Sequence, residues 1–181
     1  TPTQTILVKT HFLQTPTPTI LIKTTLIWCG KSLEKGVRKI EFVNLSEIIK
    51  NRNDVNKFKV FVTGAGGSGN DPKVMGDPEY APKNSVCSQS YLYSAFNTEQ
   101  EAKNFIKYIK TRFFRVLVSA MKITQSAPSK VYKFVPLENL SSISDIDWSK
   151  SIPELDKQLY AKYALTEEEI GFIESMIKPM E

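Results

Sequence analysis

Hydrophobic and polar positions along the chain predict several short strands. Residues 57–63 (KFKVFVT) alternate between polar and apolar side chains, which is typical of a half-buried strand. A second strand is expected over 85–96 (SVCSQSYLYSAF) and a third over 131–137 (VYKFVPL). Residues 25–43 predict two more short strands on either side of the turn GKSLEKG.

The strongest helical pattern follows Thr98. Thr98 and Glu101 have the spacing of a capping box, in which each side chain satisfies a free backbone N–H of the other residue. Apolar side chains then recur at helical spacing to about residue 121, so one long amphipathic helix is expected over 98–121. The apolar face of this helix comprises Ala102, Phe105, Ile106, Ile109, Phe113, Val116, Leu117 and Ala120.

Shorter helices are expected on both sides of that element. Ser46 would cap one over roughly 47–56, and Ser151 with Pro153 would begin another that runs to about 163. Thr166 and Glu169 form a second capping box, which opens a helix to about 177. Strands and helices mix without a regular βαβ alternation, so the expected class is α+β. We expect a mixed β-sheet packed on one long amphipathic helix, with short helices at the C-terminus.

The N-terminal region contains a near repeat. Residues 1–10 (TPTQTILVKT) return as 15–24 (TPTPTILIKT), but two units are too few for a solenoid. We therefore divide the chain into an N-terminal repeat or leader over 1–35, to which no function is assigned, and a domain over 36–181.

Composition places the chain among soluble globular proteins. It has 181 residues, of which 41% are hydrophobic and 24% charged. A membrane span needs about 18 consecutive apolar residues, and the sequence contains no such run. The first residues lack the basic head and cleavage site of a signal peptide. Cys29 and Cys87 have no disulfide-framework spacing, so a cytoplasmic location is expected.

The charges are distributed unevenly along the chain. Residues 102–137 carry 8 Lys or Arg and no acid, whereas residues 138–181 carry 4 Lys or Arg and 10 Asp or Glu. A basic segment without acids indicates a surface that faces phosphates. The alternative is a solvated helix face without a partner. The acidic C-terminal region is not expected to face a polyanion.

A glycine-rich stretch follows the strand at 57–63. Gly64-x-Gly66-x-x-Gly69 has the spacing of a dinucleotide-binding fingerprint, which requires a helix to begin within it. Asn70-Asp71-Pro72 would break such a helix, so the fingerprint fails its context. We expect 64–84 to be a long irregular loop and assign no cofactor to it.

The sequence contains few residues that could act in catalysis or bind a metal ion. His11 is the only histidine, which argues against a histidine-based triad or a zinc site with several histidines. Asp77 with Glu101-x-Lys103 has the residue types of a metal-dependent nuclease, but the capping role of Glu101 explains that pair better. No catalytic or metal-ligating residue is therefore assigned.

The remaining candidate chemistry is nucleic-acid binding. Basic side chains would neutralise phosphates, and polar side chains in the stretch KITQSAPSK would reach base edges, since glutamine bonds adenine in a bidentate manner. Gln125 is the expected base contact, and Lys122 and Arg115 are the expected phosphate contacts. The full set of expected DNA-binding residues is Lys73, Lys103, Lys107, Lys110, Arg112, Arg115, Lys122, Thr124, Gln125, Lys130 and Lys133.

Four blocks of sequence carry a family resemblance. They are NSVCSQSYLY, AFNTEQEAKNFIKYIKTRFFRVLVSAMKITQ, VYKFVPL and QLYAKYALTEEEIGFIESMIKPM. Together they resemble the C-terminal target-recognition (specificity) domain of bacterial adenine-N6 DNA methyltransferases from type II restriction–modification systems. The resemblance covers about residues 57–180, and its specificity lies in the order and spacing of the blocks.

The chain also departs from the family pattern. It has Ser88-Gln89-Ser90-Tyr91 where the family often has Thr-Glu-Thr-Tyr, and Glu138-Asn139-Leu140 where the family often has Gln-Asp-Phe. The cofactor motif and the Asp/Asn-Pro-Pro-aromatic motif, which lie upstream in the family, are absent. The resemblance thus implies a DNA target-recognition domain over 36–181 without the catalytic half, and no catalysis by this chain alone.

The implied partners are double-stranded DNA and a methyltransferase catalytic domain of the same polypeptide. That catalytic half would bind S-adenosylmethionine and accept a flipped adenine. The parent protein would be a site-specific methyltransferase or a combined restriction–modification enzyme that also cleaves DNA. Two alternatives stay open, namely a nuclease domain of a restriction enzyme and a protein-interaction module that places its basic helix on an acidic partner.

Overall fold

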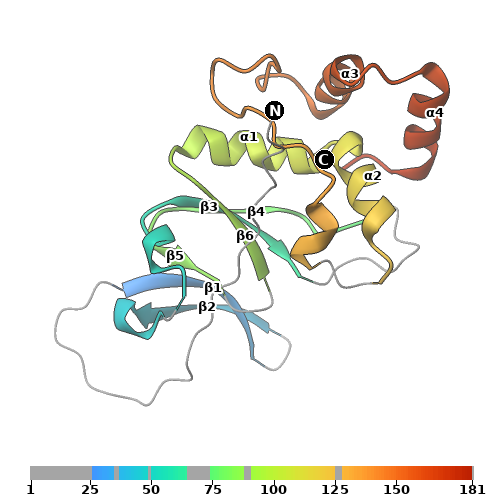
Figure 1. The fold of residues 1–181 in the computed structure, drawn as a ribbon. Helices are drawn as coiled ribbons and strands as arrows, with labels where there is room; N and C mark the ends of the chain where they lie inside the picture. Colours follow the sequence, from blue (N-terminus) through green and yellow to red (C-terminus); the bar gives the residue numbers. More distant parts are fainter. Residues whose placement is uncertain are drawn as a thin grey trace.

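The chain has an α+β fold, as expected from the sequence (Figure 1). A computed structural model describes residues 26–34, 37–48, 50–64, 74–87, 91–124 and 128–180. Its strands are β1 (Leu26–Glu34), β2 (Val37–Asn44), β3 (Phe58–Thr63), β4 (Glu79–Ala81), β5 (Ser85–Val86) and β6 (Tyr91–Phe96). Its α-helices are α1 (Glu99–Lys110), α2 (Arg112–Met121), α3 (Ile152–Lys162) and α4 (Glu167–Met176). Short 3₁₀ turns are η1 (Leu45–Glu47), η2 (Arg52–Asp54) and η3 (Ser129–Tyr132).

The strands form two three-stranded sheets. One sheet is antiparallel with the order β4-β3-β6, and β3 pairs with β6 from Phe58 opposite Phe96 to Thr63 opposite Tyr91. The other has the order β2-β1-β5, in which β1 and β2 are antiparallel and β5 runs parallel to β1. The expected strand pair within 25–43 forms, but residues 30–34 of the expected turn belong to β1, which pairs with β2 as far as Glu34 opposite Val37. The domain boundary expected between residues 35 and 36 therefore falls between two paired strands.

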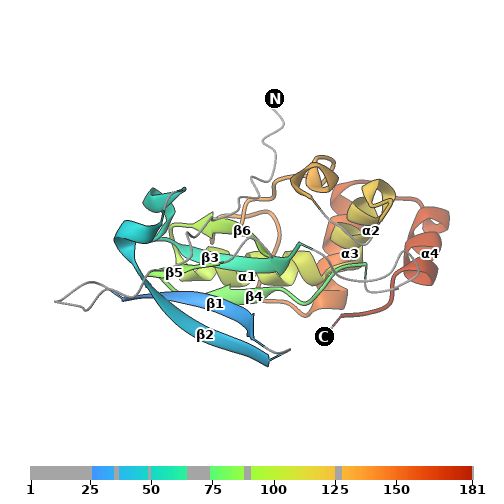
Figure 2. The ribbon, with the colours of Figure 1, turned by 90° about the horizontal axis from the view of Figure 1, so that it is seen from below.

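Helix α1 lies along one face of the β4-β3-β6 sheet and contacts all three of its strands (Figure 1). Strands β1 and β2 lie on the opposite side of that sheet (Figure 1), whereas α2, α3 and α4 gather at one end of the molecule (Figure 2). The main core forms where α1 and α2 meet these layers. It includes Phe105, Tyr108 and Phe114, whose rings contact one another, with Tyr108 and Phe114 edge to face at 5.0 Å.

The expected long helix is two helices, with a break at Thr111. Its ψ of 149° is extended, so the helical hydrogen bonds of α1 end there and those of α2 begin. The Thr111 hydroxyl accepts a bond from Phe114 N at 3.2 Å and donates to Tyr108 O at 2.6 Å. Both helices pack against the same core, so their apolar residues keep the same spacing across the break. The hydrophobic pattern alone therefore predicts one helix.

Two other expectations about local structure are wrong for backbone reasons. The helix expected over 47–56 is replaced by η1 and η2, because Asn51 adopts a left-handed conformation with φ 56°. The strand expected over 131–137 is a series of turns that begins with η3, in which Val135 N donates to Tyr132 O at 3.1 Å. Val131, Tyr132 and Val135 are buried there as they would be in a strand.

The strand expected over 85–96 is divided between the two sheets, with β5 pairing to β1 and β6 pairing to β3. The segment 64–84 is not entirely irregular, because β4 forms within it and pairs with β3 at a sheet edge. Prolines flank β4, which is compatible with an edge strand. Residues 65–73 of the glycine-rich loop, and the N-terminal repeat, lie outside the described residues.

The remaining expectations about elements are confirmed. Strand β3 covers the alternating segment, and α3 and α4 begin and end close to the expected residues. The capping boxes of Thr98 with Glu101 and Thr166 with Glu169 are both formed. Within the part of the chain that is described, no helix is both long enough and apolar enough to cross a membrane.

Candidate nucleic-acid interface

The lysines of α1 are less available to an external anion than their sequence pattern indicates. The Lys103 ammonium pairs with Glu99 at 2.7 Å on the exposed side of the first turn. Lys107 donates to the carbonyl oxygens of Trp148, Ser149 and Lys150 at 2.7, 3.3 and 3.2 Å. Three acceptors match the three N–H donors of an ammonium group. Lys107 therefore holds the segment before α3 against α1, and its contact with DNA stays a prediction.

The arginines of α2 also face the protein. Arg112 is half-buried, and its Nε donates to Ile177 O at 3.1 Å while its guanidinium lies 3.4 Å from Glu174. Arg115 is 0% exposed, so the expectation that it contacts a DNA phosphate is wrong. The sequence around these arginines does not indicate that they are buried. Their contacts come from the C-terminal region and from the end of a helix, which are not adjacent acids in the sequence.

The residues that follow α2 lie at the end of the glycine-rich loop. Lys122 is half-buried, and its ammonium donates to the carbonyl oxygen of Val74, the first described residue after that loop. Ile123 is 94% exposed, and Thr124 is exposed beside it. The structure thus places Lys122, at the start of the KITQSAPSK turn, beside Val74, which follows the glycine-rich loop.

Two more expected lysines lie at η3. Lys130 and Lys133 are exposed, while Val131 and Tyr132 between them are buried in the core. Phe134 follows and is 58% exposed. Burial of Val131 and Tyr132 holds the turn in place, and with it the backbone of both lysines.

We define the α2–η3 surface as Lys122, Ile123, Thr124, Lys130, Lys133 and Phe134. Its two halves lie close together, because only residues 125–127 separate Thr124 from Pro128 and four residue steps span at most about 14 Å. Lys110 lies outside this surface and is half-buried in the last turn of α1. Lys73 and Gln125, also expected to bind DNA, lie outside the described residues.

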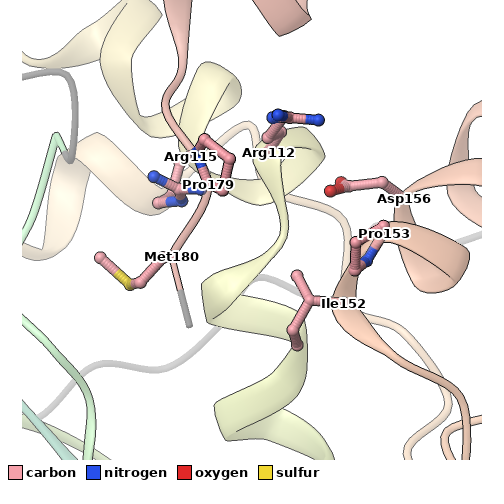
Figure 3. A pocket seen from close by; sticks show the side chains of 7 residues that line it. All are labelled: Arg112, Arg115, Ile152, Pro153, Asp156, Pro179 and Met180. Atoms are coloured by element: carbon pink, nitrogen blue, oxygen red, sulfur yellow. The ribbon is translucent and has the colours of Figure 1, made fainter.

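A cavity of about 240 Å³ lies beneath α2, between the start of α3 and the C-terminal segment (Figure 3). Its lining combines two cations, one carboxylate and several apolar side chains. These are Arg112, Arg115, Ile152, Pro153, Asp156, Pro179 and Met180. Arg115 Nε donates to Thr111 O at 3.2 Å, whereas both terminal guanidinium nitrogens are buried without a hydrogen-bond partner.

Asp156 forms the opposite part of that cavity and is 3% exposed. Its Oδ1 accepts a hydrogen bond from Phe113 N at 3.0 Å, so it caps the first turn of α2. Burial raises the pKa of Asp156, although the hydrogen bonds and the two arginines oppose the rise. Burial lowers the pKa of the Arg115 guanidinium, and the charge of Asp156 opposes that change.

Sequence reasoning misses Asp156 and the C-terminal segment as parts of any site. An aspartate one turn into an amphipathic helix is expected in solvent, and nothing in the sequence indicates that α3 packs against the first turn of α2. Only the basic pair Arg112 and Arg115, three positions apart, marks this region.

The described residues are expected to hold no metal ion, and their metal-ligating side chains do not gather in one place. Among the described residues, no group of three or more His, Cys, Asp and Glu side chains is arranged to hold a metal ion. Glu101 accepts bonds from Thr98 N and Oγ at 3.0 and 2.7 Å, which is its capping role. Comparisons with protein-family models, with curated proteins and with solved structures find no match to this chain.

Proposed function

We propose that this chain recognises a sequence in double-stranded DNA, as the target-recognition part of an adenine-N6 DNA methyltransferase of a restriction–modification system. The observation that carries the proposal is the hydrogen bond from Lys122 to Val74 O, which joins the end of the glycine-rich loop to the turn after α2. Val74 and Lys122, which are distant in the sequence, are thereby adjacent, so the loop before Val74 and the turn after Lys122 start from one place on the molecule.

The composition of the α2–η3 surface supports the same proposal. Lys130 and Lys133 are exposed cations on a turn with buried anchors, and the stretch 102–137 contains no acid to repel a phosphate. Thr124 and Gln125 supply the polar side chains that read base edges. Lys122 ties the loop to the turn, and its contribution to DNA binding is chiefly to fix that geometry.

Different residues of the chain would supply the affinity for DNA and the sequence preference. Lys130 and Lys133 attract any duplex, because phosphate contacts are independent of sequence. Lys73, in the glycine-rich loop, would add a phosphate contact from the other segment. Methyl transfer is assigned to a catalytic part that binds S-adenosylmethionine and accepts the flipped adenine. That part is the proposed partner of this chain, together with DNA.

Sequence selection from a random duplex library tests the proposal. The chain should enrich one short sequence, and Gln125→Ala should then reduce discrimination at one base pair by about 1–3 kcal/mol. Gln100→Ala is the matched control, because Gln100 lies in α1 and bonds Asn104 Oδ1 at 2.9 Å. It should leave the preference unchanged.

Three outcomes would count against parts of this account. Absence of any enriched sequence would reject sequence recognition by this chain. An unchanged preference in Gln125→Ala would reject the base-reading role of that residue alone. Strand cleavage of the enriched duplex on addition of Mg²⁺ would favour a restriction nuclease instead.

A further inference from the structure

The buried guanidinium of Arg115 has hydrogen-bonding capacity that the protein does not use. Its Nε is satisfied by Thr111 O, whereas Nη1 and Nη2 are buried at the cavity wall without a hydrogen-bond partner. A buried charged donor without an acceptor is costly, and an arginine fork is shaped to hold two oxygens of a carboxylate or phosphate. An oxyanion would satisfy both nitrogens at once.

The protein itself does not supply that counterpart among its described residues. Asp156 is the acid in the cavity lining, but it makes no ion pair with Arg115 and accepts the Phe113 N–H instead. Arg112, the second cation of the lining, is held by Ile177 O and lies near Glu174. The lining thus carries two positive charges and one negative, and its unused donors belong to Arg115.

The rest of the cavity wall is apolar. Ile152 and Pro153 contribute one side, and Pro179 and Met180 the other (Figure 3). Cavities of roughly 150 Å³ in proteins accommodate benzene, so about 240 Å³ leaves room for a ring and an attached oxyanion. A DNA backbone is too large to enter a space of this size.

We propose that this cavity binds a small organic anion, in which a carboxylate or phosphate group bonded to Arg115 is joined to a compact apolar group packed on Ile152, Pro153 and Met180. The site is separate from the α2–η3 surface and does not depend on the proposed role in DNA recognition. Because the ligand would contact α2, α3 and the C-terminal segment together, its binding would fix these three elements against one another.

Titration of the full chain with three probes, followed by amide NMR at constant ionic strength, tests this proposal. Benzoate and phenyl phosphate share a ring and an oxyanion, whereas benzyl alcohol has the ring without the charge. At least one anion should give saturable shifts at the Ile152 and Met180 amides, with at least tenfold tighter binding than benzyl alcohol. Binding by phenyl phosphate alone, or by benzoate alone, would identify which oxyanion the site prefers.

Variants at Arg115 separate anion recognition from general binding. Arg115→Met keeps an unbranched, uncharged stem but removes the guanidinium group, and it should weaken anion binding at least tenfold. Lys103→Met, which removes an exposed cation outside the cavity, should leave it unchanged. If Arg115→Met does not fold, Arg115→Lys serves instead, because it keeps the charge but loses the fork and should also weaken binding.

The proposal is overturned by any of three results. They are equal affinity for benzyl alcohol and the anions, unchanged anion affinity in the folded Arg115 variant, and the absence of saturable shifts at the cavity amides with both anions.

Discussion

At the scale of single residues, Lys59 shows how far burial alters a side chain that the sequence places in solvent. It is 0% exposed in β3, and its Nζ donates to Val55 O at 3.1 Å and Lys57 O at 2.8 Å. Burial lowers its pKa from 10.5 to about 8, against the opposing charges of Asp54 and Cys87. A neutral amine has two N–H donors, which suffice for these two carbonyl groups.

This environment predicts that stability increases with pH above neutrality. Between about pH 8 and 10.5 the unfolded chain binds a proton at Lys59 that the folded chain has lost. The free energy of unfolding should therefore rise by about 2 kcal/mol between pH 7.5 and 9.5 from this group. Urea unfolding at a series of pH values measures the effect as the difference between the wild type and a Lys59 variant, because buried tyrosines with raised pKa values increasingly oppose the rise towards pH 10.

Lys59→Met is the control for that prediction. It removes the titrating group and retains an unbranched side chain of similar length, so the rise with pH should disappear even if overall stability falls. Parallel pH profiles for the variant and the wild type would show that Lys59 is not the group responsible.

Charged side chains are also where sequence reasoning about the site is least accurate. The acid-free stretch contains the exposed Lys130 and Lys133, but its charge pattern does not distinguish them from the half-buried Lys107 and the buried Arg115. The difference depends on carbonyl groups at residues 148–150 and on the packing of the C-terminal segment. Such partners are remote in sequence, so charge periodicity carries no information about them.

At the scale of elements, local signals predict where helices begin better than where they are interrupted. The Thr-x-x-Glu pairs before α1 and α4 are short-range chemistry, and both capping boxes form. The break at Thr111 has no glycine or proline to mark it. It depends on the fit of α1 and α2 to one core, which is a tertiary property.

Thr111 therefore has a role that substitution can isolate. Thr111→Ala removes the hydroxyl that accepts from Phe114 N, and it should lower the free energy of unfolding by about 1–2 kcal/mol, as for other buried caps. Thr111→Ser keeps the hydroxyl and should recover most of that loss. Urea unfolding of the two variants at one pH measures the difference. Equal losses in both would assign the effect to the missing methyl group instead.

At the scale of the whole molecule, the acidic C-terminal region lies against the basic stretch rather than away from it. Arg112 contacts Ile177 and Glu174, and Lys107 holds residues 148–150. Among the acids of this region, Glu138 is buried and pairs with Lys162 at 2.6 Å. The charge asymmetry of the sequence is thus partly a means of assembling the fold, and only its exposed remainder is available to a polyanion.

The α+β class and most element positions follow from the sequence, whereas the division into two sheets does not. Strands β5 and β6 lie within one segment, 85–96, that the sequence predicts as a single strand, and their separate partners, β1 and β3, are distant along the chain. Pairing of this kind is set by the assembled layers. The same layers decide which of the expected DNA-binding residues reach the surface.

The most direct test of the DNA-binding proposal is the salt dependence of duplex binding by the chain. Fluorescence anisotropy with a mixed-sequence duplex at several KCl concentrations gives the slope of log affinity against log salt. The double variant Lys130→Ala with Lys133→Ala should lower the magnitude of that slope by about 2, because each phosphate contact contributes roughly 0.9. Lys157→Ala, an exposed lysine of α3, should leave it unchanged. No measurable binding by the wild type, or equal slopes for all three proteins, would contradict the assignment of the α2–η3 surface to DNA.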